Sequence, residues 1–272
     1  MSVLESIIYG FVSGLTEFMP VSPQAHQAVM MRLFGLSVRE PVRDMFVHIA
    51  VILALVTTCK AMFTHFNLAN TSNRRNRKMA ARRELYDVRL IKTAVLPLLL
   101  GLLFYFSTRK YEANHLILVL LFIINGILVI IPEYARHGNK DARFMSGWDA
   151  VIMGLLGAAS AFPGISRVAT VNLYATLRGT SRTNCINWVL LLSVPVLVLW
   201  IFIDLILLFI LPITQITIVT FLQYLLSALS AYFGGCLGIA LMRYLSVNTG
   251  YSAFAYYSWG AAMLTFVLYL IA

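Results

Sequence analysis

The fold is decided by the stretch Thr16-Glu17-Phe18-Met19-Pro20-Val21-Ser22-Pro23-Gln24-Ala25-His26, which interrupts a long apolar segment near the N-terminus. A second polar stretch, Phe162-Pro163-Gly164-Ile165-Ser166-Arg167, interrupts another apolar segment in the same way. Each is too polar and too rich in proline for one continuous apolar helix. We therefore predict that residues 3–35 and 147–179 each form a helical hairpin, in which two short helices flank a loop.

The composition places these hairpins in a membrane. Of the 272 residues 60% are hydrophobic and 12% are charged, whereas a soluble protein carries roughly 25% charged residues. We expect an integral membrane protein with a single polytopic domain over residues 1–272. The net charge of +10 arises largely from basic residues between 60 and 92, and such clustering indicates membrane topology rather than nucleic-acid binding.

Six segments have the length and apolar character of a membrane-crossing helix, which needs about 20 residues. They are 46–63, 93–107, 115–132, 188–213, 216–242 and 253–271. Irregular backbone at membrane depth requires surrounding protein or a water-filled cavity, so both hairpins are predicted to be re-entrant. The expected fold is all-α, with six transmembrane helices and two re-entrant hairpins.

The basic loop 64–92 is expected to be cytoplasmic under the positive-inside rule. Alternation along the chain then places both termini outside, with the first hairpin entering from outside and the second from the cytoplasm. Opposed hairpins predict an inverted-topology repeat, an arrangement that places binding sites near the membrane midplane.

Ionisable residues within membrane segments are functional candidates, because burying them in lipid is costly. Glu17, His26 and Arg167 lie at the predicted hairpin tips, where they suit a phosphate group. Arginine offers a planar fork of donors, and helix N-termini add N–H groups. A Glu and His pair can move protons or attack phosphorus, and Glu17 can alternatively hold a divalent cation.

Other candidates have structural explanations of equal or greater weight. Ser22 and Ser166 occupy N-cap positions, with Pro23 at the first helical position of its helix, so capping is favoured over nucleophilic attack. His48 is expected to be a packed, hydrogen-bonded residue. For Asp204 a structural partner and a role in the site both stay open.

At the two tips the sequence resembles the undecaprenyl-diphosphatase family, the bacitracin-resistance phosphatases of bacteria. That family carries Glu-x-x-x-Glu-Phe-Leu-Pro-Val-Ser-Ser-x-x-His and Pro-Gly-x-Ser-Arg-Ser-Gly, which match residues 13–26 and 163–169 here. Weaker matches extend the resemblance over roughly residues 3–270. The resemblance implies six transmembrane helices, two opposed re-entrant hairpins and a site open to the outer face of the bacterial plasma membrane.

The resemblance further implies hydrolysis of undecaprenyl diphosphate to the monophosphate and phosphate, for recycling of the cell-wall lipid carrier, usually with a divalent cation such as Mg²⁺ or Ca²⁺. Glu17 would be the acid/base or cation-linked carboxylate, His26 the essential histidine and Arg167 the phosphate clamp. Ser22 and Ser166 match two retained serines, and Thr170 lies one residue before the position of a family threonine. We assign Ser22, Ser166 and Thr170 to substrate binding.

At several motif positions the sequence departs from the family pattern, and two of these departures replace a carboxylate and a hydroxyl that phosphate hydrolysis can use. The first glutamate is Ser13 here, the second serine is Pro23, and Val168 and Ala169 replace a serine and a glycine. If the second serine is required, the chain is a carrier or flippase that binds polyprenyl phosphates without cleaving them. If His26 is the nucleophile or activates water with Glu17, hydrolysis survives.

A third interpretation, from the same arginine site, is a transporter of small anions. The expected partners are a polyprenyl diphosphate and membrane lipid, with no nucleic acid, and a homodimer is left open. The leading hypothesis is a membrane phosphatase.

Overall fold

The computed structural model describes residues 1–36, 39–60, 84–108, 111, 114–135, 138, 140, 144–211 and 216–271. Within these ranges the chain is helical apart from short connections and one isolated β-bridge between Lys140 and Thr180. The all-α prediction is therefore confirmed for the described residues. In chain order the elements are α1 (Val3–Glu17), α2 (Pro23–Leu33), α3 (Pro41–Thr58), α6 (Glu84–Leu98), α7 (Leu100–Thr108), α8 (His115–Tyr134), α9 (Gly147–Ala158), the 3-10 turn η3 (Ala159–Ala161), α10 (Arg167–Leu177), α11 (Arg182–Ile210), α12 (Ile218–Asn248) and α13 (Ser252–Ile271).

The described residues contain six helical segments that are long and apolar enough to cross a membrane, in the predicted order. They are Pro41–Thr58, Arg89–Thr108, His115–Tyr134, Arg182–Ile210, Ile218–Asn248 and Ser252–Ile271. The chain is a multi-pass membrane protein. Most of the predicted cytoplasmic loop 64–92 lies outside the described residues, which resume at Glu84.

Two predicted spans differ from the structure in a way that has a physical cause. The span predicted over 46–63 is α3, which begins at Pro41. It accommodates Arg43 and Asp44 because their side chains form a buried ion pair with 3.1 Å between Nη2 and Oδ1. The span predicted over 93–107 is divided at Leu99 into α6 and α7, close to Pro97, which has no N–H to donate along the helix.

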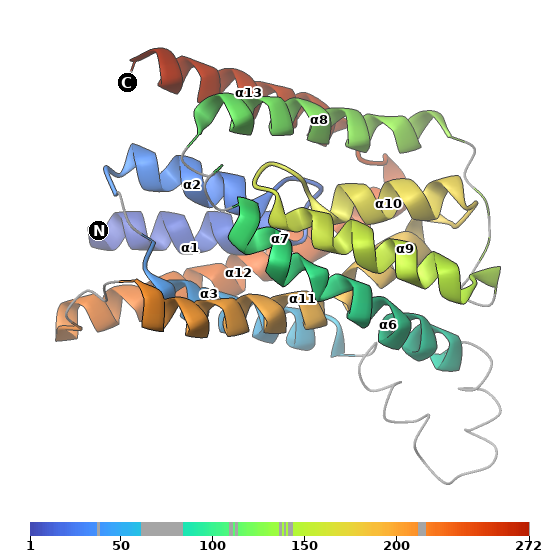
Figure 1. Ribbon diagram of the computed structural model, residues 1–272, viewed down its shortest axis with the longest axis horizontal. Coiled ribbons are helices and arrows are strands. Elements are labelled where there is room, and N and C mark those ends of the chain that lie inside the picture. The colour runs from blue at the N-terminus through green and yellow to red at the C-terminus, as the bar shows by residue number, and fades with distance from the viewer. Residues whose placement is uncertain are drawn as a thin grey trace, which may run out of the picture.

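Each predicted hairpin is a pair of short helices joined by a loop. Figure 1 shows α1 and α2 approaching from the end of the bundle that carries both termini, and α9 and α10 from the opposite end. The two connecting loops meet at about mid-length (Figure 1). Their tips are therefore held together inside the protein.

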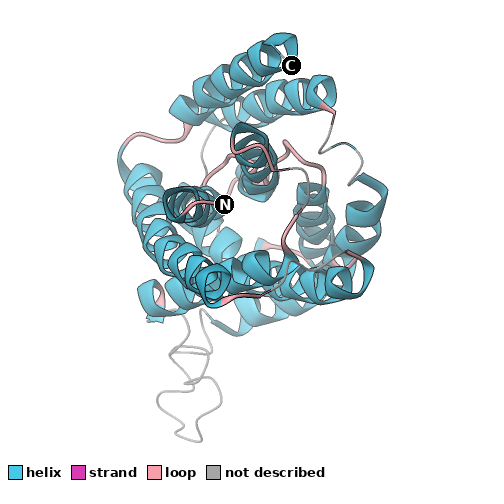
Figure 2. Ribbon diagram, turned by 90° about the vertical axis from the view of Figure 1, so that its left-hand side faces the viewer, coloured by secondary structure: helices cyan, strands magenta, loops and turns pink. Residues whose placement is uncertain are grey.

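Small residues let the first hairpin lie close to the long helices. A Cβ atom on Gly14 of α1 would overlap the carbonyl oxygen of Ala231 of α12, so the two helix backbones are in direct contact, as in small-residue packing between membrane helices. Viewed along the bundle, the pair α8 and α13 lies at one side and the remaining helices surround the hairpin tips (Figure 2).

Candidate active site

Two serines cap the return helices of the hairpins and also join the two loops. Ser22 accepts a hydrogen bond from the N–H of Ala25 at the start of α2, and a second one, 2.9 Å long, from the N–H of Gly164 in the opposite loop. Ser166 caps α10 through the N–H of Ala169 and donates its hydroxyl to the carbonyl oxygen of Met19. The capping prediction is confirmed for both serines, and each cap also fixes the other hairpin.

Asn125 of α8 connects the same two loops from the side. Its amide nitrogen donates to the carbonyl oxygen of Pro20 at 2.9 Å, and its amide oxygen accepts the N–H of Ser166 at 2.8 Å. The amide nitrogen also donates to Ser258 of α13. Asn125 is fully buried, so these bonds satisfy a polar side chain whose burial would otherwise cost free energy.

Glu17 and Arg167 form a buried ion pair where the hairpins meet. Glu17 is the last residue of α1 and Arg167 the first of α10, as predicted. Nη1 of Arg167 donates to Oε1 of Glu17 at 3.1 Å, while Nη2 donates to the carbonyl oxygen of Glu17 and to the hydroxyl of Ser193. The Nε of Arg167 is buried without a hydrogen-bond partner among the described residues. The guanidinium thus retains one N–H group that can donate a hydrogen bond to an anion.

His26 lies on the other side of the hairpin tip. Its Nδ1 is 2.6 Å from the carbonyl oxygen of Ser22 and its Nε2 is 2.8 Å from the hydroxyl of Tyr257. The imidazole stacks on Tyr257 and meets Phe122 edge-on. The structure therefore brings Glu17 and Arg167 together, and it places His26 against α8 and α13.

Thr170 acts within its own hairpin. The single hydrogen of its hydroxyl is within hydrogen-bond reach of the carbonyl oxygens of Leu156, Ser166 and Arg167, the shortest distance being 2.9 Å to Leu156. Its assigned contact with substrate remains a prediction.

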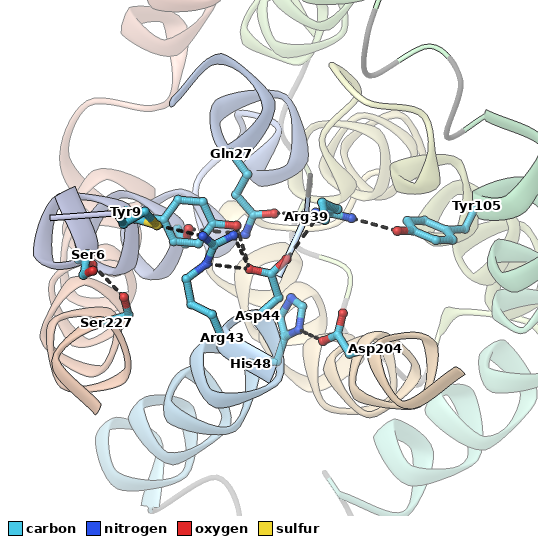
Figure 3. A network of polar contacts seen from close by, with 12 residues as sticks. Ser6, Tyr9, Gln27, Arg39, Arg43, Asp44, His48, Tyr105, Asp204 and Ser227 are labelled. Atoms are coloured by element: carbon cyan, nitrogen blue, oxygen red, sulfur yellow. Dashed lines mark hydrogen bonds and ion pairs between the residues drawn. The ribbon is translucent and has the colours of Figure 1, made fainter. Parts of the chain in front are cut away.

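A narrow polar cavity lies beside Glu17. The cavity has a volume of about 10 Å³, which is close to what one water molecule requires. Two further ionisable side chains in its wall are paired, because Nδ1 of His48 lies 2.7 Å from Oδ2 of Asp204 (Figure 3). The cavity is lined by Glu17, Pro23, Gln24, Gln27, Arg39, His48, Tyr105, Trp200, Ile203 and Asp204.

A network of charged residues extends from this cavity toward the start of α3 (Figure 3). Arg39 donates to Gln27 and to the hydroxyl of Tyr105, both at 2.8 Å, and its Nε lies 3.6 Å from Asp44. Asp44 also accepts hydrogen bonds from Tyr9 and Arg43. Charged side chains can be buried when they are paired. These paired residues therefore form the polar wall that continues from the cavity.

Sequence reasoning missed Arg39, Arg43 and Asp44, since it placed them outside the first span. A signal was present: Asp44 and His48 are four residues apart and therefore share one face of a helix. His48 in turn is the residue that reaches Asp204. A charged face of this kind on an apolar helix indicates polar partners inside the protein.

The donors around the cavity suit a divalent cation only in part. Among the described residues no group of three or more His, Cys, Asp or Glu could hold a metal ion by itself. Glu17 lines the cavity, whereas Asp204 is engaged with His48. Mg²⁺ is commonly held by one or two carboxylates together with substrate phosphates. Glu17 therefore offers one carboxylate to a cation whose other ligands a bound diphosphate would supply.

An apolar groove of about 280 Å³ is lined by residues of α2, α8 and α13, among them His26. Its walls include Val29, Met30, Phe122 and Leu264. A second apolar groove, of about 530 Å³, lies between α6 and α11 and is lined almost entirely by aliphatic residues. Only the first groove contains a residue of the hairpin tips among those described.

A family model described as "Bacitracin resistance protein BacA" matches residues 6–264. The chain belongs to this family. The match covers both hairpin tips and all six spans except the last residues of α13. The family resemblance of the two tip motifs is confirmed.

Curated relatives of the chain carry consistent names. It is 28% identical over 206 residues to "Undecaprenyl-diphosphatase 1" of Shouchella clausii, and the match covers 72% of each of the two chains. It is 26% identical over 268 residues, or 98% of either chain, to "Undecaprenyl-diphosphatase 3" of Bacillus cereus. It is 28% identical over 195 residues to the "Undecaprenyl-diphosphatase" of Methanococcus maripaludis, covering 71% of this chain and 75% of that relative.

Proposed function

We propose that this protein hydrolyses undecaprenyl diphosphate to undecaprenyl phosphate and phosphate within the membrane. The observation that carries the proposal is the buried Glu17–Arg167 pair at the joined hairpin tips. Membership of the BacA family and the names of its relatives support the same reaction. The alternatives of a carrier or an anion transporter have no comparable support.

The diphosphate binds where the N-termini of α2 and α10 come together. Both termini offer N–H groups and the positive end of a helix dipole. A phosphate oxygen replaces Oε1 of Glu17 as the acceptor for Nη1 of Arg167, and a second oxygen accepts the unpartnered Nε. Ser22 and Ser166 hold the two loops at the spacing that this binding requires.

Glu17, once displaced from Arg167, is the cation-linked carboxylate of the site. A divalent cation, Mg²⁺ or Ca²⁺, would be held by Glu17 together with the diphosphate, and it would supply positive charge for the oxygens of the reacting phosphate. His26 reaches the reacting phosphate only if its imidazole leaves Tyr257 and the Ser22 carbonyl, because both ring nitrogens are engaged.

The polyprenyl tail occupies the apolar groove that begins at His26. Its volume of about 280 Å³ accommodates the first part of an isoprenoid chain, and the remainder continues into lipid. Apolar contact of this kind contributes roughly 25 cal/mol per Å² of buried surface.

The two hairpins belong to an inverted-topology repeat and re-enter the membrane from opposite sides. In support, α1 contacts α12 through Gly14, and α9 contacts α6 in the same manner through Gly154, where a Cβ atom would overlap the carbonyl oxygen of Ala94. Both termini lie at one end of the bundle (Figure 1). In this proposal the site opens outward and loop 64–92 is cytoplasmic in a bacterial plasma membrane.

The test is phosphate release from undecaprenyl diphosphate by the detergent-purified protein, with Mg²⁺, with Ca²⁺ and with a chelator. Release that is lost in Glu17→Ala supports the proposal. Retained lipid binding without any release in the three conditions would instead favour the carrier. His26→Ala, measured in parallel, tests the catalytic role assigned to that histidine, and light scattering of the same sample decides between a monomer and a homodimer.

A further inference from the structure

The second pair of ionisable side chains at the cavity, His48 with Asp204, has no role in the reaction described above. It is formed by residues 156 positions apart in the sequence, from α3 and α11, and both side chains are buried. The pair faces the same cavity as Glu17. Ionisable side chains within a membrane helix bundle are costly to bury and mark functional sites by default.

The geometry of the pair is that of a histidine oriented by a carboxylate. Asp204 accepts from Nδ1 at 2.7 Å, so the ring is fixed and Nε2 is the nitrogen left to take a proton. The same arrangement orients the general base in hydrolases, where the carboxylate also stabilises the imidazolium that forms.

A second observation shows where a water molecule would be held. Oε1 of Gln24 is buried and has no hydrogen-bond partner among the described residues, and Gln24 lines the cavity together with His48. Buried acceptors are rarely left unsatisfied in native proteins. A water between them would donate one hydrogen to Gln24 and the other to Nε2 of His48, and the cavity has room for about one.

Pro23 lines this cavity as well, and its ring carries no hydroxyl that could attack phosphorus. His26, the other histidine near the hairpin tips, lines the apolar groove instead of this cavity. Of these side chains, the His48–Asp204 pair therefore offers a base on the side of the diphosphate where Glu17 lies.

We propose that His48 is the general base that activates the attacking water and that Asp204 positions it, which rests on the proposed hydrolysis. The water oxygen forms a bond to the terminal phosphorus of the diphosphate, and its proton passes to Nε2 of His48. The bond from that phosphorus to the bridging oxygen breaks, and its electron pair leaves with undecaprenyl phosphate. His48 then returns its proton to the released phosphate or to solvent.

The experiment compares His48→Gln, Asp204→Asn and the unchanged protein in phosphate release across pH. Loss of a general base is expected to lower kcat about 100-fold or more in His48→Gln, with KM changed little. In Asp204→Asn the imidazolium loses its counter-charge, so kcat falls and the acid limb of the pH–rate profile moves to lower pH. The other titratable or charged groups that face the pair are Glu17 of α1, Arg39 and Asp44 near the start of α3, and Tyr105 of α7.

A chemical rescue separates catalysis from structure. Imidazole in solution is expected to restore part of the activity of His48→Ala but none in the double variant His48→Ala/Asp204→Asn, because the carboxylate that orients imidazole is then missing. His115→Gln is the matched control, since His115 contacts Arg32 and Tyr269 away from the cavity, and its activity is expected to be unchanged.

The outcomes distinguish this inference from the function on which it rests. Full activity of His48→Gln, or an unshifted pH profile in Asp204→Asn, would overturn the inference and leave the phosphatase intact. Absence of phosphate release by the unchanged protein would overturn both. If His48→Gln does not fold, the pH profile of the nearly isosteric Asp204→Asn still decides.

Discussion

At the scale of single residues, the Glu17–Arg167 pair combines a structural and a binding role. Both side chains are less than one-tenth exposed, and removing one partner of a buried pair leaves an uncompensated charge that costs roughly 3–5 kcal/mol. Substrate binding is therefore an exchange, in which a phosphate takes the place of the carboxylate at Arg167.

This exchange predicts different effects on stability and on binding. Arg167→Ala should abolish lipid binding and lower the melting temperature, whereas the double variant Glu17→Ala/Arg167→Ala should recover much of the stability and none of the binding. Thermal unfolding in detergent and binding of undecaprenyl diphosphate measure the two effects. Undiminished affinity in Arg167→Ala would exclude Arg167 as the phosphate clamp.

Pro23 tests whether the missing serine matters. It is the first residue of α2 and lines the cavity beside Glu17, so Pro23→Ser places a hydroxyl at the proposed site of attack. With water as the nucleophile we expect turnover within about twofold of the unchanged protein, since the water activated by His48 already supplies the attacking oxygen. A gain of tenfold or more in steady-state phosphate release would favour a serine nucleophile.

The helix caps at the hairpin tips could be predicted from sequence because the preferences of the capping positions are local. Serine before Pro23 and before Arg167 is a capping signal, and the structure has both caps. The side on which His26 lies was not predictable, because it depends on Tyr257, which is 231 residues away in sequence. The pairing of His48 with Asp204 depends on helix contacts for the same reason.

At the scale of elements, the close approach of α1 to α12 determines the position of Glu17 at the end of α1. Gly14 lies one turn before Glu17, and any side chain there would overlap Ala231. Gly14→Ala should therefore separate the helices and destabilise the protein by about 1–3 kcal/mol, as overpacked cores do. Loss of phosphate release should accompany the lower melting temperature.

Gly101→Ala is the control for this substitution. Gly101 is also buried within a helix, but the nearest atom to an added Cβ, on Ala158, is 3.5 Å away, which is an ordinary contact. Since alanine is the better helix former by about 1 kcal/mol, stability should be equal or higher. Equal losses in both variants would show that the α1–α12 contact has no special role.

The helical spans were predictable because length and apolar character determine them. Their ends were less so: α3 extends back to Pro41 because Asp44 is neutralised by Arg43 and bonded to Tyr9. Hydropathy treats each charge alone, whereas pairing across elements decides whether a charge can be buried.

At the scale of the whole molecule, two hairpins from opposite ends of the bundle contribute one half each to the site. Glu17 and Ser22 come from the first, and Arg167 and Ser166 from the second. Asn125 and the two capping serines join the loops directly. The site therefore exists only when the complete bundle is assembled, and its access is set by the orientation of the bundle in the membrane.

That orientation gives the last prediction. The proposed topology places the connection before α12 outside and the connection after it in the cytoplasm, so Ile216→Cys should react with a membrane-impermeant thiol reagent on intact cells, and Thr249→Cys only after permeabilisation. Both positions are exposed at opposite ends of α12, and Cys59 and Cys185 are buried. The variants are compared with the unchanged chain, whose Cys236 sets the background. The reverse pattern would turn the site toward the cytoplasm, where it would act on lipid of the inner leaflet.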